Sequence, residues 1–441
     1  MQKTSVSFHT LGCRLNQSET ATLRRTFELD GWQVVDFEKP ADLVVINTCT
    51  VTEEGDADTR RLVHKALRVN PHSRIALIGC QAQIQKEKLA KLPHVAWIVG
   101  NARKMDLVSI LKESAASAES PAEVITPPIP KESFTSPVAA IDCEHTRANL
   151  KIQDGCDSFC SFCEIPYARG RARSRQFADL LREAETLVAA GHKELVLTGV
   201  NLGAYRGPRH PGAEGNAQEK RLLDVIDRLE TIAGLQRIRI SSIEPTTIPE
   251  ELFERMNPSS KLCRYLHVPL QSGSDPILKA MKRRYRVKEF CELIERADRM
   301  VPGICLGTDV IVGFPGETDE DFSHTYHVLR DLPLGYFHVF SYSKRQLAQS
   351  RHLPDCVDVA KIQERSRLLR ELSSRKRQRF LQGLLGTPQN VLFEQKKEED
   401  TWEGLTDNYA RVKVFSKDNL RNQLVEVHLD RLEGQVMRGH C

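Results

Sequence analysis

Short strand-like runs alternate with helical stretches along most of the chain, and this alternation restricts the fold more than any other feature. In the first hundred residues, the runs VSFHTLGC, DLVVINTC and RIALIGC are separated by helical patterns. A second alternation begins at 150–155 and continues through the runs at 194–199, 237–244, 265–273, 304–314 and 336–343. Strands that alternate with helices are typical of parallel sheets, so the sequence predicts two α/β units.

The second unit has enough strands and crossover helices for a partial (β/α)6 barrel, although an open doubly wound sheet would give the same pattern. After it, a basic helical stretch at 361–380 precedes the β-like runs NVLFEQ, ARVKVF and LVEVHL, which predict a small all-β barrel. The predicted organisation is an N-terminal parallel α/β domain at 3–113, a Ser-, Ala- and Pro-rich linker at 114–141, the partial barrel at 142–372 and the small β-barrel at 375–440.

Composition excludes several classes of protein. The 441 residues are 40% hydrophobic and 28% charged, and no apolar run approaches the roughly 20 residues that cross a bilayer. The first residues, MQKTSVSFHT, lack a signal-peptide core, so we expect a cytoplasmic protein. We also expect a monomer. In a reducing compartment its twelve cysteines are predicted to be thiols or metal ligands instead of a disulfide framework.

Three cysteines lie close together directly after the first strand of the second unit, in the stretch DGCDSFCSFCEIPYARG. Cys156, Cys160 and Cys163 supply three soft ligands, which suits an iron–sulfur cluster with one open iron, whereas structural zinc normally takes a fourth ligand. The same spacing fits one face of a helix that buries small side chains. Gly155 and the polar residues after Cys156 favour a loop and therefore a cluster.

Three more cysteines each end a strand-like run of the first unit. If those strands are parallel, Cys13, Cys49 and Cys80 converge at one edge of the sheet. A single cysteine at a strand end is more often a small buried residue. Three such positions in one domain favour a second metal site assembled in space.

These motifs carry a resemblance to known enzymes. The CxxxCxxC loop after a first barrel strand is similar to that of the radical AdoMet enzymes. LGCRLN with Glu19, INTCTV and IGCQAQ resemble the three motifs of the methylthiotransferase family, and the last β-unit resembles a TRAM domain. The resemblance implies two [4Fe–4S] clusters, an auxiliary one on Cys13, Cys49 and Cys80 and a radical-generating one on Cys156, Cys160 and Cys163. It also implies that S-adenosylmethionine serves as methyl donor and radical source.

Further strand ends are candidates for cofactor contact, because ligands of parallel sheets collect where strands end. Gly199 and Gly203 would let the backbone approach the methionine part of S-adenosylmethionine. Polar contacts to cofactor or substrate are expected from Glu244, Gln271 and Asp309. Each of these residues taken singly also fits ordinary turn chemistry.

Within the family, the sequence texture is most similar to the branch that methylthiolates threonylcarbamoyladenosine (t6A) in tRNA at C2 of the adenine. The branches that act on isopentenyladenosine or on an aspartate of a ribosomal protein remain alternatives, as does a non-catalytic iron–sulfur RNA-binding protein. Basic residues agree with an RNA partner. The RNA-binding candidates are Arg169, Arg171, Arg173, Arg375, Lys376 and Arg377, with Arg175, Arg283, Arg284 and Arg379 nearby and Trp402 and Tyr409 for stacking.

The resemblance also implies a low-potential electron donor, a flavodoxin or ferredoxin, and a sulfur donor. One departure concerns the stretch after FSYSKR (340–345), where the family leads us to expect a Pro-Gly-Thr turn but the chain reads QLAQSRHLPDC. We expect this difference to alter local substrate contacts more than the chemistry. The remaining cysteines have no ligand pattern and are predicted to be plain thiols: Cys143, Cys263, Cys291, Cys305, Cys356 and Cys441.

Overall fold

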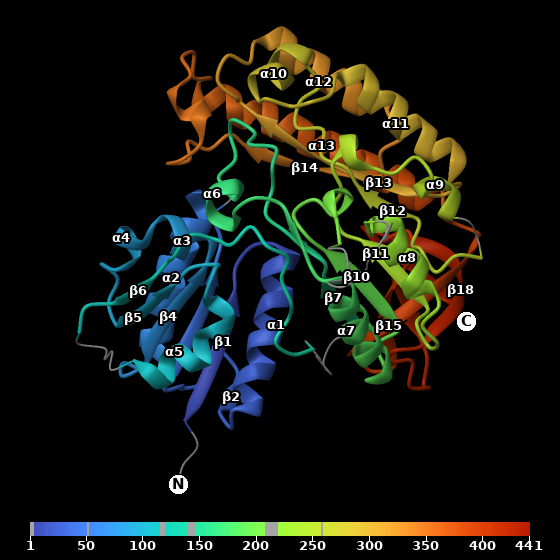
Figure 1. Ribbon diagram of the computed structural model, residues 1–441. Helices are drawn as coiled ribbons and strands as arrows, with labels where there is room; N and C mark the ends of the chain where they lie inside the picture. Colours follow the sequence, from blue (N-terminus) through green and yellow to red (C-terminus); the bar gives the residue numbers. More distant parts are fainter. Residues whose placement is uncertain (1–3, 51–52, 115–119, 140–145, 208–218, 257–258) are drawn as a thin grey trace.

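A computed structural model describes residues 4–441 apart from 51–52, 115–119, 140–145, 208–218 and 257–258. Cys143 lies outside the described residues. The chain forms an N-terminal sheet with its helices, a central curved sheet, and a C-terminal barrel (Figure 1). No helix among the described residues combines the length and apolar character that a membrane span requires.

The N-terminal sheet is parallel throughout, with strand order β2-β1-β3-β4-β5-β6. Helices cover both faces, and each face buries its own apolar cluster. The strands are β1 (Ser5–Thr10), β2 (Gln33–Val35), β3 (Leu43–Thr48), β4 (Arg74–Gly79), β5 (Val95–Val99) and β6 (Glu123–Ile125). The helices are α1 (Arg14–Leu29), α2 (Glu53–Val69), α3 (Cys80–Ile84), α4 (Lys86–Leu89) and α5 (Leu107–Glu113). The strand order reverses between β1 and β3, so this sheet is doubly wound.

The segment predicted as a linker adds a strand to the N-terminal sheet and a single bridge to the central unit. Glu123–Ile125 form β6, which pairs in parallel with β5, and Phe134 makes a bridge to Arg175 of the central unit. The run EVI is only three residues long and lies between Ser- and Pro-rich neighbours, so the sequence pattern did not predict a strand there. The open edge of β5 provides the hydrogen-bonding partner that three residues alone lack.

The central unit is the predicted partial barrel. Its six main strands lie in two three-stranded parallel sheets, β11-β10-β7 and β12-β13-β14, which a parallel bridge between Ile238 and Leu262 brings together. Strand order therefore follows chain order without a reversal, which excludes the doubly wound alternative for this unit. The strands are β7 (Arg147–Lys151), β10 (Glu194–Thr198), β11 (Arg237–Ile240), β12 (Tyr265–His267), β13 (Cys305–Val312) and β14 (Tyr336–Ser341).

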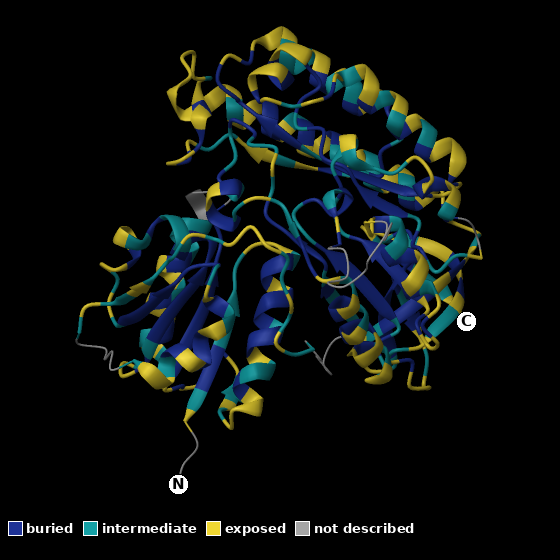
Figure 2. Cartoon of the chain, viewed as in Figure 1, coloured by how far each residue is buried: buried dark blue, intermediate teal, exposed yellow. Residues whose placement is uncertain are grey.

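Helices pack on the outside of these strands and leave their polar faces in solvent (Figure 2). The helix that follows β13 begins with a capping box, because Thr318 Oγ1 accepts a hydrogen bond from the N–H of Asp321 at 3.1 Å and the Asp321 carboxylate accepts one from the N–H of Thr318. The outer helices are α7 (Phe177–Ala189), α8 (Leu222–Glu230), α9 (Leu252–Arg255), α10 (Asp275–Ala280), α11 (Val287–Met300) and α12 (Asp319–Asp331). Two short strands, β8 (Gln153–Asp154) and β9 (Arg173–Ser174), and the helix α6 (Ile165–Arg169) follow β7.

The basic stretch forms the 24-residue helix α13 (Val359–Gln382), which packs on β14 and leads into the C-terminal barrel. That barrel is closed in the order β15-β16-β17-β19-β18, as the three β-like runs led us to expect. Its strands are β15 (Pro388–Glu398), β16 (Thr401–Thr406), β17 (Arg411–Phe415), β18 (Leu424–Glu433) and β19 (Val436–His440). Val391, Phe393 and Val412 belong to its buried core.

Candidate active site: two cysteine triads beside one cavity

Cys13, Cys49 and Cys80 follow three neighbouring strands, β1, β3 and β4, at their carboxyl ends. They therefore lie at one edge of the sheet, at and beside the point where the strand order reverses. Gly12 has φ +86°, and a Cβ placed on it would lie 2.6 Å from Cys49 Sγ. The backbone that carries Cys13 thus passes directly against the Cys49 side chain, which only glycine permits.

Cys156, Cys160 and Cys163 occupy a loop between β8 and α6, as the polar residues around them predicted. Each sulfur accepts a hydrogen bond, from Ser158 N at 3.4 Å, from Arg283 Nη1 at 3.2 Å and from Ile165 N at 3.4 Å respectively. Donors aimed at sulfur stabilise thiolate ligands and tune the clusters that they hold.

Burial raises the pKa of the Cys160 and Cys163 thiols, and the guanidinium of Arg283 opposes that rise at Cys160. Burial thus disfavours the thiolate form in the protein alone, and a bound metal would displace the proton. Three cysteines on one short loop, each with a hydrogen-bond donor at its sulfur, fit an iron–sulfur cluster with three protein ligands.

A cavity of about 1140 Å³ adjoins the first triad. Its wall includes Cys13 and Cys49 of the N-terminal sheet. Other parts of the wall come from the inner face of the barrel, from one face of α13 and from the C-terminal barrel at Tyr409. All three units of the chain therefore contribute to one space.

Gly199 and Gly203, which were predicted to contact the cofactor, instead pack against other residues of the chain. A Cβ on Gly203 would lie 2.2 Å from the carbonyl oxygen of Thr247, and one on Gly199 would lie 3.0 Å from Gln153. These glycines therefore allow close packing between neighbouring loops. Glu244 forms an ion pair with Arg283, the residue that donates to Cys160 Sγ. Glu244 thus holds a guanidinium beside the second triad.

The other two predicted contacts lie where the chain after β12 pairs with β13. Gln271 has φ +71°, and its backbone pairs with β13 through the carbonyl of Asp309 at 2.8 Å. The Asp309 carboxylate lies 3.0 Å from His267 Nε2 and lines the cavity. Ligand atoms of His267, Asp309 and His338 all lie within 4.8 Å of one another. Sequence reasoning missed both histidines, because only the pairing of β12, β13 and β14 brings them together.

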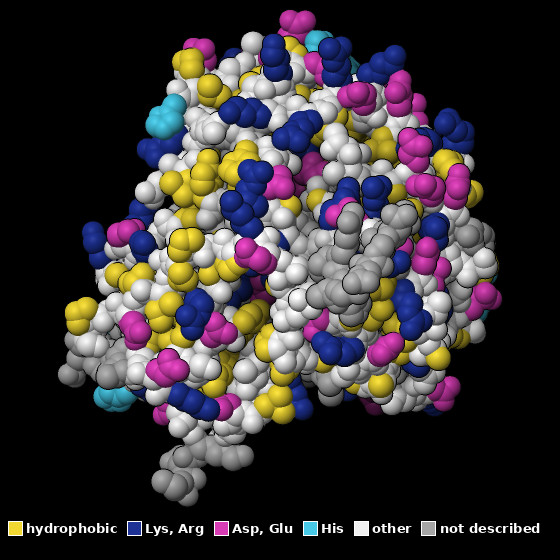
Figure 3. Space-filling model, viewed as in Figure 1, with side chains coloured by type: hydrophobic (Ala, Val, Ile, Leu, Met, Phe, Trp, Pro, Cys, Tyr) yellow, Lys and Arg dark blue, Asp and Glu magenta, His cyan; other side chains and the backbone are white. Residues whose placement is uncertain are grey.

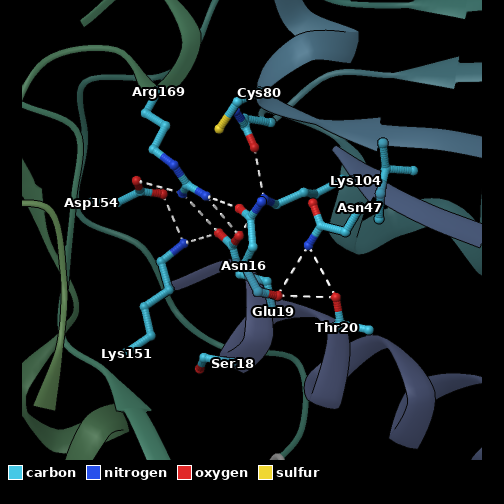
Figure 4. Close-up of polar contacts among 12 residues, drawn as sticks. Asn16, Ser18, Glu19, Thr20, Asn47, Cys80, Lys104, Lys151, Asp154 and Arg169 are labelled. Atoms are coloured by element: carbon cyan, nitrogen blue, oxygen red, sulfur yellow. Dashed lines mark hydrogen bonds and ion pairs between the residues drawn. The ribbon is translucent and has the colours of Figure 1, made fainter. Parts of the chain in front are cut away.

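Arg169 corrects one prediction. Its side chain is 1% exposed and belongs to a buried ion network between α1 and the central unit, so it is not an RNA-binding surface residue. Arg169 Nη2 lies 3.0 Å from Glu19 Oε2, and Nη1 lies 3.0 Å from Asp154 Oδ1 (Figure 4). Lys151 and Lys104 also pair with Glu19. The single helical turn of α6 after the cysteine loop directs Arg169 inward.

This buried network, formed by Glu19, Lys104, Lys151, Asp154 and Arg169, lies between the two triads. Asp154 directly precedes the loop of the second triad. Lys104 donates to Asn101 Oδ1 at 2.7 Å, and Asn101 Nδ2 lies 3.6 Å from Cys80 Sγ. Desolvation opposes ionisation of Glu19, but Arg169, Lys104 and Lys151 outweigh it and hold its pKa well below the usual range.

A second ion network joins the same two units. Arg345, 4% exposed, lies 3.2 Å from Glu164 Oε2 and 3.1 Å from Asp56 of α2, and it donates to Thr50 Oγ1 at 2.9 Å. Glu164 follows Cys163, and Thr50 follows Cys49. Leu347 N also donates to Glu164 Oε1 at 2.8 Å. The stretch that departs from the expected Pro-Gly-Thr turn is therefore anchored beside both triads.

The remaining basic candidates differ in accessibility. Arg171 and Arg375 are exposed, whereas Arg173 pairs with Asp154. Lys376 donates to the carbonyl of Leu332, and Arg377 to that of Tyr409. Arg175 and Arg283 are held in internal ion pairs. On the face in Figure 3, basic and acidic side chains are interspersed. Trp402 is 7% exposed and belongs to the barrel core, so it is not available for stacking.

Comparison with known proteins agrees with this geometry. Residues 150–329 match the Radical SAM superfamily, and residues 5–100 match the uncharacterized protein family UPF0004. A threonylcarbamoyladenosine tRNA methylthiotransferase (MtaB) of Bacillus subtilis (strain 168) is 34% identical over 98% of this chain and 96% of its own length. The chain belongs to the methylthiotransferase family of radical SAM enzymes.

Other relatives include the MtaB of Aquifex aeolicus (strain VF5), 37% identical over 92% of this chain and 96% of the relative. A tRNA-2-methylthio-N(6)-dimethylallyladenosine synthase of Thermodesulfovibrio yellowstonii is 31% identical over 99% of this chain and all of the relative. Among solved structures, the radical S-adenosylmethionine methyltransferase TsrM of Kitasatospora setae shares the fold with a TM-score of 0.52 at 16% identity, over 76% of this chain and 72% of that one. The protein is therefore a transferase whose cofactors are S-adenosylmethionine and two [4Fe–4S] clusters.

Proposed function

We propose that the protein adds a methylthio group to C2 of the adenine in threonylcarbamoyladenosine beside the tRNA anticodon. The observation that carries this proposal is the cavity that runs from Cys13 and Cys49 to the inner face of the barrel. The relatives named for t6A in Bacillus subtilis and Aquifex aeolicus are 34% and 37% identical to this chain, against 31% for the dimethylallyladenosine synthase of Thermodesulfovibrio yellowstonii, which supports t6A over isopentenyladenosine.

The two triads would divide the chemistry between them. Cys13, Cys49 and Cys80 would hold the auxiliary cluster, and Cys156, Cys160 and Cys163 the cluster that binds S-adenosylmethionine. Bound there, the clusters and S-adenosylmethionine supply reductive radical formation and the transferred sulfur and methyl groups. The chain itself positions the two sites through its buried ion networks.

We propose that a flavodoxin or ferredoxin supplies the electron, that a separate sulfur donor serves the auxiliary site, and that the protein acts as a monomer in the cytoplasm. Arg171 and Arg375 are the exposed members of the predicted RNA-binding set and would contact phosphates.

Nucleoside analysis tests the proposal. tRNA from a deletion strain should lack methylthiolated t6A, and wild-type protein should restore it, whereas Cys160→Ala should not. If the protein restores methylthiolated isopentenyladenosine instead, its substrate is isopentenyladenosine and the t6A proposal is wrong. Modification of a ribosomal-protein aspartate, measured by mass spectrometry in the same strains, would identify the third branch.

A non-catalytic role is tested separately. Reduced, cluster-loaded protein should convert S-adenosylmethionine to 5′-deoxyadenosine, and Cys160→Ala should abolish this reaction. Absence of turnover in protein with full iron content would favour a non-catalytic RNA-binding protein.

A further inference from the structure

One wall of the cavity is lined by basic and small polar side chains. Arg370, Ser373, Ser374 and Arg377 of α13 line it, and their spacing of three, four and seven residues places them on one face of that helix. Arg14, directly after Cys13, lines the same cavity from the N-terminal unit. Guanidinium groups from two units thus face one space beside the first cysteine triad.

The guanidinium groups of Arg14, Arg370 and Arg377 have N–H donors that are not engaged by a carboxylate of the described residues. Arg14 donates to the Tyr409 hydroxyl at 2.5 Å, and Arg377 donates to the Tyr409 carbonyl at 2.7 Å. Arg370 donates to none of the described residues and is exposed. The positive charge on this wall is therefore available to bind an anion.

The acidic groups of the cavity are already engaged. Asp58 pairs with Arg61, and Asp309 lies 3.0 Å from His267 Nε2. The cavity wall therefore carries an excess of positive charge next to Cys13 and Cys49. An anionic group on a bound substrate would find complementary charge there.

The floor beside this wall is aromatic. Tyr336, His338 and Phe340 alternate along β14, so their side chains share one face of the strand, and all three line the cavity. The Tyr336 and His338 rings meet edge to face at 5.2 Å, and Phe340 is 37% exposed. Exposed aromatic faces stack on unpaired bases of single-stranded RNA loops.

We propose that Arg370, assisted by Arg14 and Arg377, binds the carboxylate of the threonine moiety on N6 of the substrate adenine. This inference rests on the proposed function. The threonylcarbamoyl group carries a carboxylate at neutral pH, whereas the isopentenyl group is an uncharged hydrocarbon. Arginine binds carboxylates through paired N–H donors, so Arg370 is a specificity-determining residue for t6A.

Binding to cluster-free protein tests the proposal without activity. Wild-type protein should bind an anticodon stem-loop with t6A roughly ten- to a hundredfold more tightly than the same stem-loop with a carboxamide in place of the carboxylate, as charge-assisted hydrogen bonds predict. Arg370→Gln should remove most of this preference, leaving only the part that Arg14 and Arg377 supply, and should keep the affinity for the carboxamide RNA within about twofold. Fluorescence anisotropy measures both dissociation constants.

Arg367→Gln is the matched control. Arg367 lies on the same helix, is exposed and pairs with Glu371 at 2.6 Å, so its removal should leave the preference for the carboxylate intact. Equal weakening of both RNAs by Arg370→Gln would assign this residue to a backbone phosphate and overturn the proposal. The proposal also fails if wild-type protein does not distinguish the two RNAs.

Turnover distinguishes this proposal from the function on which it rests. If cluster-loaded wild-type enzyme methylthiolates isopentenyladenosine and not t6A, the proposed function fails. If it methylthiolates t6A and Arg370→Gln does so with an unchanged kcat/KM for carboxylate and carboxamide substrates, only the role of Arg370 fails.

Discussion

Glu19→Gln should strongly destabilise the N-terminal unit. The Glu19 carboxylate is fully buried, and its partners Lys104 and Arg169 are 2% and 1% exposed. Within this network, three cations face two carboxylates, and the substitution leaves Asp154, which also pairs with Arg173, as the one remaining carboxylate. Loss of one partner from a buried ion network costs about 3–5 kcal/mol, because the remaining charges stay desolvated and unpaired.

Urea unfolding of the cluster-free protein, followed by tryptophan fluorescence, measures this loss. Trp32 and Trp97 both pack in the N-terminal core, and the midpoint of their transition should fall by about 2 M for a unit of this size. Glu28→Gln is the control on the same helix, because Glu28 forms an exposed pair with Arg25 and should contribute under about 1 kcal/mol.

The pH dependence gives a second readout. The pKa of Glu19 is depressed in the folded state, so its contribution is present above the unfolded pKa of about 4.5 and is lost as the pH falls below that value. Glu19→Gln should therefore flatten the acid side of the stability curve. A variant that unfolds within about 1 kcal/mol of wild type would refute the network's role in joining the units.

Three further predictions concern the cysteine sites and α13. Anaerobically reconstituted protein should hold about eight irons, and the triple variant Cys156→Ala, Cys160→Ala, Cys163→Ala about four, whereas a fall from four to none would remove the auxiliary site. Gly12→Ala should lower iron content and thermal stability, because its methyl group would lie 2.6 Å from Cys49 Sγ at a φ of +86°; iron content equal to wild type would contradict this. Burial lowers the pKa of Lys376 to about 8, so wild-type stability should rise between about pH 8 and 10.5 as the folded state loses this proton first. Thermal melts at pH 7.5 and 9.5 should show a smaller increase in melting temperature for Lys376→Met than for wild type. An identical increase in both proteins would refute this role of Lys376.

Several parts of this protein could be predicted from sequence because local patterns determine them. Alternating strands and helices predict parallel sheets, and residues that end strands must gather at one sheet edge. The predicted convergence of Cys13, Cys49 and Cys80 therefore agrees with the observed neighbours β1, β3 and β4. The loop around Cys156 followed from glycine and polar residues nearby.

Tertiary structure alone decided which charged residues are accessible. Arg169 and Arg171 look alike in sequence, yet the first is buried against Glu19 and the second is exposed. Ion pairs between units depend on packing over separations of more than a hundred residues, which no local pattern records. Arg345 and Asp56 illustrate the same point, because only the fold brings them together beside the cysteine triads.

The cavity itself also arises only from the assembled chain. Cys13, His338 and Arg370 come from a strand end, a barrel strand and a long helix, and nothing in sequence indicates that the three line one space. The sequence by itself therefore determined the chemistry that the chain can support. The packing of three units determined where a substrate can meet it, because a cavity is a property of surfaces that face one another in space.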